Sequence, residues 1–132
     1  MPIDVVVQER YGDAFAVVEV AGEVDAANCG VLAEALGRAG DRYPVVVVDL
    51  TQVGLLSAAG LHCLDCAEVA VTERQGALHL VSPESSPVRS MMRHVQLHHS
   101  WPVHRSMTQA LRQVTQQLLA AEVGEVASAA ES

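Results

Sequence analysis

The 132-residue sequence contains no lysine, and only four of its residues are aromatic: one Phe, one Trp and two Tyr. Without lysine the chain supplies neither a Schiff-base amine nor the ammonium group of a nucleotide-binding phosphate loop. The formal net charge is −8, so nucleic acid and anionic membrane surfaces, which attract clustered Lys and Arg, are repelled. We therefore expect no nucleic-acid partner and no membrane partner.

Long hydrophobic runs are also missing. No stretch approaches the ~18 apolar residues of a membrane span, and the start, Met1 to Asp4, lacks the positive charge of a signal peptide. We expect a cytoplasmic protein. Three cysteines, an odd number, argue against a disulfide framework. Cys63 and Cys66 have C-x-x-C spacing inside a predicted helix, past its first turn, where packed cysteines are expected rather than a thioredoxin-type site.

Motifs for metal binding and catalysis are equally scarce. His94, His98 and His99 are close in sequence but have no carboxylate or thiol at ligand spacing. Ser57 is not part of a Gly-x-Ser-x-Gly sequence, and no histidine is placed by the sequence to activate it. We expect no metal, no cofactor and no enzymatic activity.

Apolar residues, by contrast, make up half of the chain, enough for one core in a single domain. Four consecutive valines, 45–48, lie between Pro44 and Asp49 and predict a strand buried on both faces, as at the centre of a parallel sheet. The predicted strands are residues 3–10, 14–21, 45–50, 77–81 and 103–104, and the predicted helices are residues 26–39, 58–74, 87–95 and 106–118.

This order, β-β-α-β-α-β-α-β-α, predicts an α/β fold with a mixed four- to five-stranded sheet and about four helices. The first two strands form a hairpin, so the first is expected to be antiparallel and the others parallel. The domain is predicted to cover residues 1–124. Residues 125–132, rich in Ala, Ser and Glu, are predicted to be a flexible tail.

The candidate site follows the central strand, because function in open α/β sheets concentrates beyond the carboxyl ends of such strands. Residues 55–60, Leu-Leu-Ser-Ala-Ala-Gly, place a hydroxyl and three small residues where strand meets helix. A phosphate on Ser57 would meet free backbone N–H groups and the positive end of the helix dipole, and would add charge to a docking surface. Alternatively, Ser57 is only the N-cap of the helix, with small residues behind it for tight packing.

Three segments resemble the STAS domain family, the fold of bacterial anti-sigma factor antagonists. Residues 22–25 resemble its Gly-Glu-Leu/Val-Asp segment, and residues 45–51 resemble its strand ending in Asp-Leu-Ser/Thr. Residues 55–61 are similar to its apolar pair followed by Asp-Ser-Ser/Ala-Gly and Leu or Val. The resemblance covers residues 5–118. It implies a protein that binds an anti-sigma factor of the serine kinase type and so frees a sigma factor, until the serine after the Asp is phosphorylated.

The sequence departs from this pattern at the phosphorylation site. The family's Asp falls on Ser57, and its phosphoacceptor serine falls on Ala58, which has no hydroxyl. Three interpretations stay open: Ser57 accepts the phosphate instead, the protein is a permanently competent binder, or it serves another partner. Such a partner would make it a soluble adaptor or an accessory subunit of a membrane transporter or signalling complex. Small-molecule sensing near the same turn is a further class, disfavoured by the missing lysine and phosphate loop.

The predicted protein-binding face gathers the polar and small residues around this turn: Asp25, Asn28, Ser57, Ala58, Ala59, Gly60, His62 and Asp65. The two aspartates are expected either to pair with basic partner side chains or to cap and solvate helices. An exposed sheet edge offers a surface for a homodimer.

Overall fold

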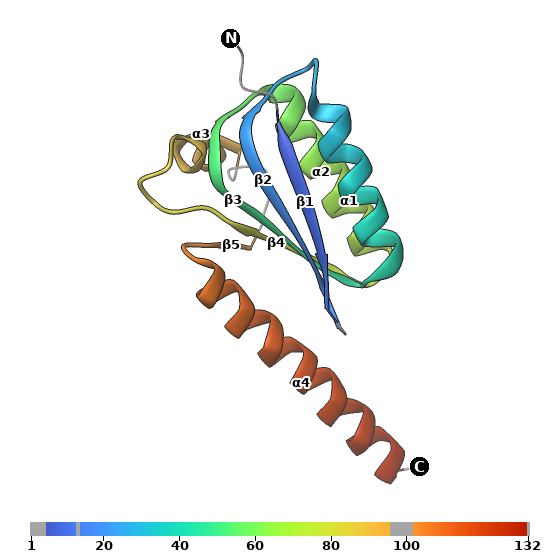
Figure 1. Ribbon diagram of the computed structural model, residues 1–132. Helices are drawn as coiled ribbons and strands as arrows, with labels where there is room; N and C mark the ends of the chain where they lie inside the picture. The colour runs from blue at the N-terminus through green and yellow to red at the C-terminus, as the bar shows by residue number, and fades with distance from the viewer. Residues whose placement is uncertain (1–4, 13, 96–101, 132) are drawn as a thin grey trace.

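The computed structural model describes residues 5–12, 14–95 and 102–131. In this part of the chain five strands form one mixed sheet in the order β1-β2-β3-β4-β5 (Figure 1). Only β1 is antiparallel to its neighbour. The predicted α/β class and element order are confirmed. The elements are β1 (Val6–Tyr11), β2 (Ala16–Val24), α1 (Cys29–Arg42), β3 (Val45–Leu56), α2 (Ala58–Glu73), β4 (Ala77–Val81), α3 (Pro87–Val95), β5 (Val103–His104) and α4 (Met107–Glu131).

The core lies on both faces of the central strand β3. Val46 and Val48 face the larger cluster, which includes residues of α1, α2 and α3, whereas Val45 and Val47 pack with Ala110 and Val114 of α4 on the opposite face. The two faces explain why four consecutive valines are all buried. Figure 1 shows α1 and α2 together on one side of the sheet and α4 leading away from it.

Strands β2 and β3 are longer than the sequence pattern predicts. The central strand does not end at Leu50 but continues to Leu56, and β2 runs through residues 22–24 instead of leaving the sheet there. The extensions pair with each other, Gly22 with Val53 and Val24 with Leu56, across two register shifts. Gly22 has φ 100°, a conformation that suits glycine. Pairing between these two distant segments therefore outweighs the local preference of their glycine-containing sequences for turns.

Two helix boundaries also differ from the sequence pattern. Helix α1 begins at Cys29, three residues later than predicted, because residues 26–28 form a turn. Helix α4 continues past Gly124 to Glu131. The flexibility of residues 125–132 stays a prediction.

A buried pair of histidines ties α4 to the sheet. His79 Nδ1 on β4 lies 3.0 Å from His104 Nε2 on β5, and His79 Nε2 lies 3.0 Å from Gln117 Oε1 on α4. Because the amide oxygen only accepts, His79 donates from Nε2 and accepts at Nδ1 from the His104 N–H. Burial lowers the pKa of both side chains, and the nearby His79 and Arg89 charges lower the pKa of His104 further. The network therefore forms between neutral imidazoles.

Thermal stability is expected to fall as the pH is lowered from about 7.5 to about 5.5, because unfolded histidine titrates near 6.5. Below that pH the unfolded chain binds more protons than the folded one, whose histidine pKa values are lowered, so the stability present at neutral pH is lost on acidification. Thermal unfolding followed by circular dichroism measures this. His79→Gln should make the dependence of thermal stability on pH shallower, and His62→Gln, at an exposed position outside this network, is the matched control. Equal slopes for wild type and His79→Gln would contradict the assignment.

Candidate functional site

The candidate site is the corner where β2 and β3 end and where α1 and α2 begin. The Ser57 N–H donates to the Val24 carbonyl at 2.9 Å, so the two strand ends are joined at this point. Asp25 and Ser57 directly follow the paired residues Val24 and Leu56. We call the surface formed by Asp25, Asn28, Ser57, Ala58 and Ala59 the docking corner.

Ser57 is the N-cap of α2, as one of the sequence interpretations predicts. Its Oγ accepts a hydrogen bond from the Gly60 N–H at 3.3 Å, and its carbonyl accepts from the Leu61 N–H at 3.0 Å. The extended backbone, φ −74° and ψ 171°, is typical of an N-cap. The hydroxyl oxygen is therefore already engaged in holding the first turn of the helix.

The three small residues after Ser57 have different environments. Ala58 is exposed and Ala59 is half-buried. Gly60 is buried, which corrects its predicted place on the contact face. A Cβ at this position would lie 2.6 Å from Leu56 Cδ1 and 2.9 Å from Val24 Cγ1. Gly60 thus lets α2 approach the strand ends, and Ala58 is what this stretch presents to solvent.

Asp25 and Asn28 hold the other side of the corner in a reciprocal pair of side-chain to backbone bonds. Asp25 Oδ1 accepts from the N–H groups of Ala27 at 2.9 Å and Asn28 at 3.0 Å, and Asn28 Oδ1 accepts from the Asp25 N–H at 2.9 Å. Asn28 Nδ2 donates to the Glu23 carbonyl at 2.8 Å. Asp25 therefore caps the turn ahead of α1 instead of the helix itself, and its loop is rigidly shaped before a partner arrives.

The remaining predicted residues lie further along α2. His62 is exposed and lines a groove between α1 and α2, with its Nε2 3.5 Å from Cys66 Sγ. Asp65 is half-buried and does not line that groove. The predicted face leaves out Leu55, which is 44% exposed two residues before Ser57. The predicted strand ends at residue 50, so Leu55 lies outside it, and an apolar residue at a strand end has no local signal of exposure.

Charge is distributed unequally along the two helices. Arg42 lies in the last turn of α1, and Arg74 is the C-cap of α2, so both lie far from the corner at the helix N-termini. Arg74 pairs with Asp41 at 2.7 Å. Glu23 and Asp25 are instead the charged side chains that directly precede α1 at the corner. A partner surface carrying basic side chains is complementary to this end of the domain.

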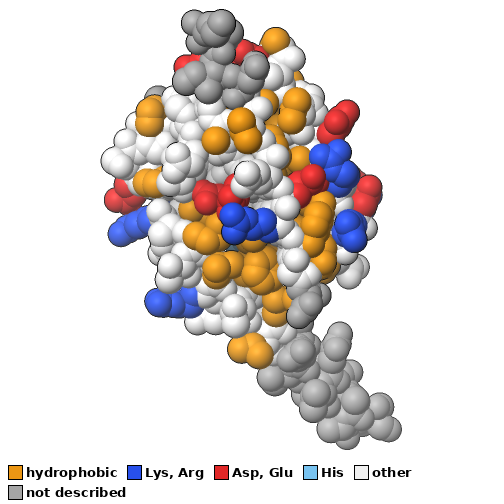
Figure 2. Space-filling view, viewed as in Figure 1, with side chains coloured by type: hydrophobic (Ala, Val, Ile, Leu, Met, Phe, Trp, Pro, Cys, Tyr) orange, Lys and Arg blue, Asp and Glu red, His pale blue; other side chains and the backbone are white. Residues whose placement is uncertain are grey.

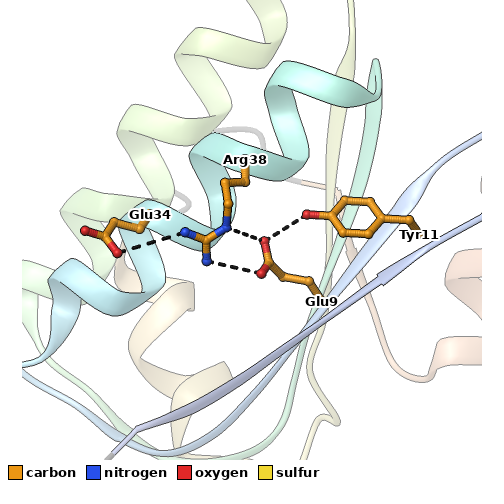
Figure 3. A network of polar contacts seen from close by, with 4 residues as sticks. All are labelled: Glu9, Tyr11, Glu34 and Arg38. Carbon is orange, nitrogen blue, oxygen red and sulfur yellow. Dashed lines mark hydrogen bonds and ion pairs between the residues drawn. The ribbon is translucent and has the colours of Figure 1, made fainter.

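Arg38 is also neutralised by acidic neighbours. Its Nε lies 2.9 Å from Glu9 Oε1 and its Nη2 3.1 Å from Glu9 Oε2 (Figure 3). Glu34, on the preceding turn of α1, lies 4.0 Å from Arg38 Nη1. The hydrogen bond from Arg38 lowers the pKa of the Glu9 carboxyl, and the Tyr11 hydroxyl donates to the same carboxylate at 2.9 Å. On the face shown in Figure 2, acidic and basic side chains likewise lie next to one another.

Among the described residues, no group of three or more His, Cys, Asp or Glu side chains is arranged to hold a metal ion. In the same part of the chain no helix is both long and apolar enough to cross a membrane. His98, His99 and the first four residues lie outside the described residues, as does the side chain of His94.

The fold and the corner together define a STAS-type regulatory domain. The family model described as MlaB, STAS domain, matches residues 7–120. The chain therefore belongs to the STAS domain family. The comparison with curated proteins gives no match.

Solved structures of anti-sigma factor antagonists share this fold. One from Mycobacterium paratuberculosis is 25% identical with a TM-score of 0.75, and the alignment covers 85% of this chain and 95% of that chain. A putative antagonist from Thermotoga maritima is 16% identical with a TM-score of 0.68, covering 83% and 94%. Phosphorylated SpoIIAA from Bacillus is 13% identical with a TM-score of 0.66, covering 83% and 99%. The last two similarities bear on the fold alone.

Proposed function

We propose that this domain is an anti-sigma factor antagonist-like module that docks onto a kinase-type anti-sigma factor and stays competent to bind. The observation that carries the proposal is the exposed Ala58 at the head of α2, in the position of the family's phosphoacceptor serine. The corner around it is well formed, but the hydroxyl that would switch it off is missing. When the domain binds the anti-sigma factor, the sigma factor is freed. The amount of the domain in the cell, instead of its phosphorylation, then controls how much sigma factor is free.

The shape of the corner supports close docking. Ala58 and Ala59 present little side-chain volume, and Leu55, two residues before Ser57, adds an exposed apolar group. The Asp25–Asn28 turn is fixed by three hydrogen bonds between its own residues, so little ordering entropy is lost on binding. Its carboxylate end suits Arg or Lys side chains of the partner, which would set orientation and association rate.

Ser57 is less suited than residue 58 to serve as a phosphoacceptor. Its Oγ already accepts from the Gly60 N–H, and the side chain is half-buried under the start of α2. A kinase would have to withdraw this oxygen from the cap, at a cost of about 1 kcal/mol. Permanent competence is therefore the interpretation that the geometry favours over a switch shifted by one residue.

The runner-up partner is a subunit of a membrane transporter or another signalling complex. The alanine at position 58 also favours this alternative, because a partner that is not a kinase needs no hydroxyl there. Co-purification of the full chain with an ATPase and a permease, without binding to an anti-sigma factor, would select this alternative. Pairing of two copies through a sheet edge stays a proposal, tested by the oligomeric state in solution.

The deciding experiment titrates the protein with a kinase-type anti-sigma factor by calorimetry, then adds ATP and Mg²⁺ and maps phosphate by mass spectrometry. Wild type is expected to bind and to stay unphosphorylated. Ala58→Ser restores the family's hydroxyl and is expected to acquire phosphate and lose affinity by about tenfold or more, as two negative charges enter the interface. Ser57→Ala is the matched control: it should lose about 1 kcal/mol of stability yet keep binding.

Two results would contradict the proposal. Phosphate on Ser57 of the wild type, with loss of binding, would establish a shifted switch in place of permanent competence. Absence of binding by wild type and by Ser57→Ala would remove the anti-sigma factor as partner.

A further inference from the structure

Three free cysteines gather between α1 and α2, beside the docking corner. The Cys63 thiol lies 3.6 Å from the carbonyl oxygen of Cys29, although the two residues are 34 positions apart in the chain. Burial raises the pKa of Cys63 to about 11, and the neighbouring Cys29 side chain acts in the same direction. Cys29 is the first residue of α1 and directly follows Asn28 of the corner. The first turn of α1 and the second turn of α2 thus meet where the Cys63 thiol contacts the backbone of Cys29.

Small oxidants can reach Cys63 through a groove, and the Cys29 side of the pair is itself only half-buried. A groove of about 310 Å³ separates α1 from α2, and Cys63, Cys66 and His62 lie along it. Ala33 and Gly37 of α1 also line it, and neither carries a bulky side chain that would fill it. This volume exceeds the ~30 Å³ share of one water molecule in the liquid about tenfold, so a peroxide molecule fits.

We propose that Cys29 and Cys63 are a modification site, at which a peroxide converts the two thiols into a disulfide that joins α1 to α2. Cys29 attacks first, because Cys63 with its pKa of about 11 stays protonated at neutral pH. The Cys29 sulfur bonds to one peroxide oxygen as the O–O bond breaks, which gives a sulfenic acid and one water molecule. The Cys63 sulfur then bonds to the Cys29 sulfur and the S–O bond breaks. The hydroxyl leaves as a second water molecule with the Cys63 proton, so two electrons have passed to the peroxide.

The disulfide alters the docking corner, a consequence that rests on the function proposed above. A disulfide bond is about 2.05 Å long, so the Cys29 and Cys63 thiols must leave the carbonyl oxygens that they now contact, those of Ala26 at 3.7 Å and Cys29 at 3.6 Å. The bond ties the first turn of α1 to α2. Asn28 moves with Cys29, and its bonds to Asp25 and Glu23 hold the corner in shape. We expect the oxidised protein to bind its partner about tenfold more weakly, which is ~1.4 kcal/mol.

The test of the site needs no partner. The full-length protein is treated with hydrogen peroxide, and digests are analysed by mass spectrometry without reduction. The expected product has lost two hydrogen atoms, links the peptides of Cys29 and Cys63, and reverts with dithiothreitol. Cys66→Ser is the matched control and should still form the bond, while Cys29→Ser and Cys63→Ser, checked for folding by circular dichroism, should not.

Other products would overturn the site. A Cys63–Cys66 bond, a bond between two copies, or peroxide products confined to Cys66, whose exposed thiol lies 3.5 Å from His62 Nε2, would each do so. Titrating reduced and oxidised protein with the anti-sigma factor separates the two proposals. Equal affinity of both forms overturns only the effect on docking, whereas failure of the reduced form to bind counts against the proposed function.

Discussion

Gly76→Ala is expected to lower the free energy of unfolding by more than about 3 kcal/mol, the largest stability effect among the substitutions considered. A Cβ on Gly76 would lie 2.0 Å from the carbonyl oxygen of Pro44 and 2.9 Å from its carbonyl carbon. These are backbone atoms that cannot rotate away. The same Pro44 oxygen accepts from the Ala77 N–H at 2.8 Å where β3 and β4 begin to pair. Relieving the clash would therefore disrupt the start of the central parallel pair.

The measurement is urea unfolding followed by circular dichroism, with Gly37→Ala as the matched control. Gly37 lies in the middle of α1, and a Cβ there would have no atom within 4 Å. Alanine should stabilise that helix by roughly 0.5–1 kcal/mol, because glycine loses more backbone entropy on folding. A Gly76→Ala protein within about 1 kcal/mol of wild type would show that the α2–β4 turn can shift at little cost.

Ala58→Arg is expected to weaken binding to the anti-sigma factor by about 100-fold or more, close to 2.8 kcal/mol. Ala58 is exposed at the first position of α2, so arginine fits the fold. A cation at a helix N-terminus costs only about 0.3–1 kcal/mol. In the complex, the long side chain would hold the partner away from Ala59 and Leu55 and would repel basic groups that approach Asp25. Steric and charge effects act in the same direction.

Calorimetry with the same anti-sigma factor measures this loss, and Gln113→Arg on the exposed side of α4 is the control. Helix α4 covers the opposite face of the sheet from α1 and α2, so that variant should bind like wild type. Similar weakening by both variants would indicate a general charge effect, and unchanged binding of Ala58→Arg would move the interface away from the corner.

The sequence itself determined the elements whose signals are local. Valines 45–48 predict a strand covered on two faces, and the small-residue turn after Ser57 predicts the start of α2, where Ser57 caps it. Strand β4 matches its predicted range of residues 77–81, and Pro87 correctly predicted the start of α3. These features depend on the hydrophobic pattern of a strand, on a helix N-cap and on a proline at the first helical position. Each of these signals lies within a few consecutive residues.

Only the tertiary structure decided features that join distant parts of the chain. The pairing of Gly22 with Val53 extends two strands through stretches with turn composition. Gly60 belongs to the predicted face by sequence, yet it is buried because α2 packs against Leu56 and Val24. Gly22 and Val53, like Val24 and Gly60, are tens of positions apart in the chain. The hydrophobic pattern of a short segment does not specify which distant residues it will contact.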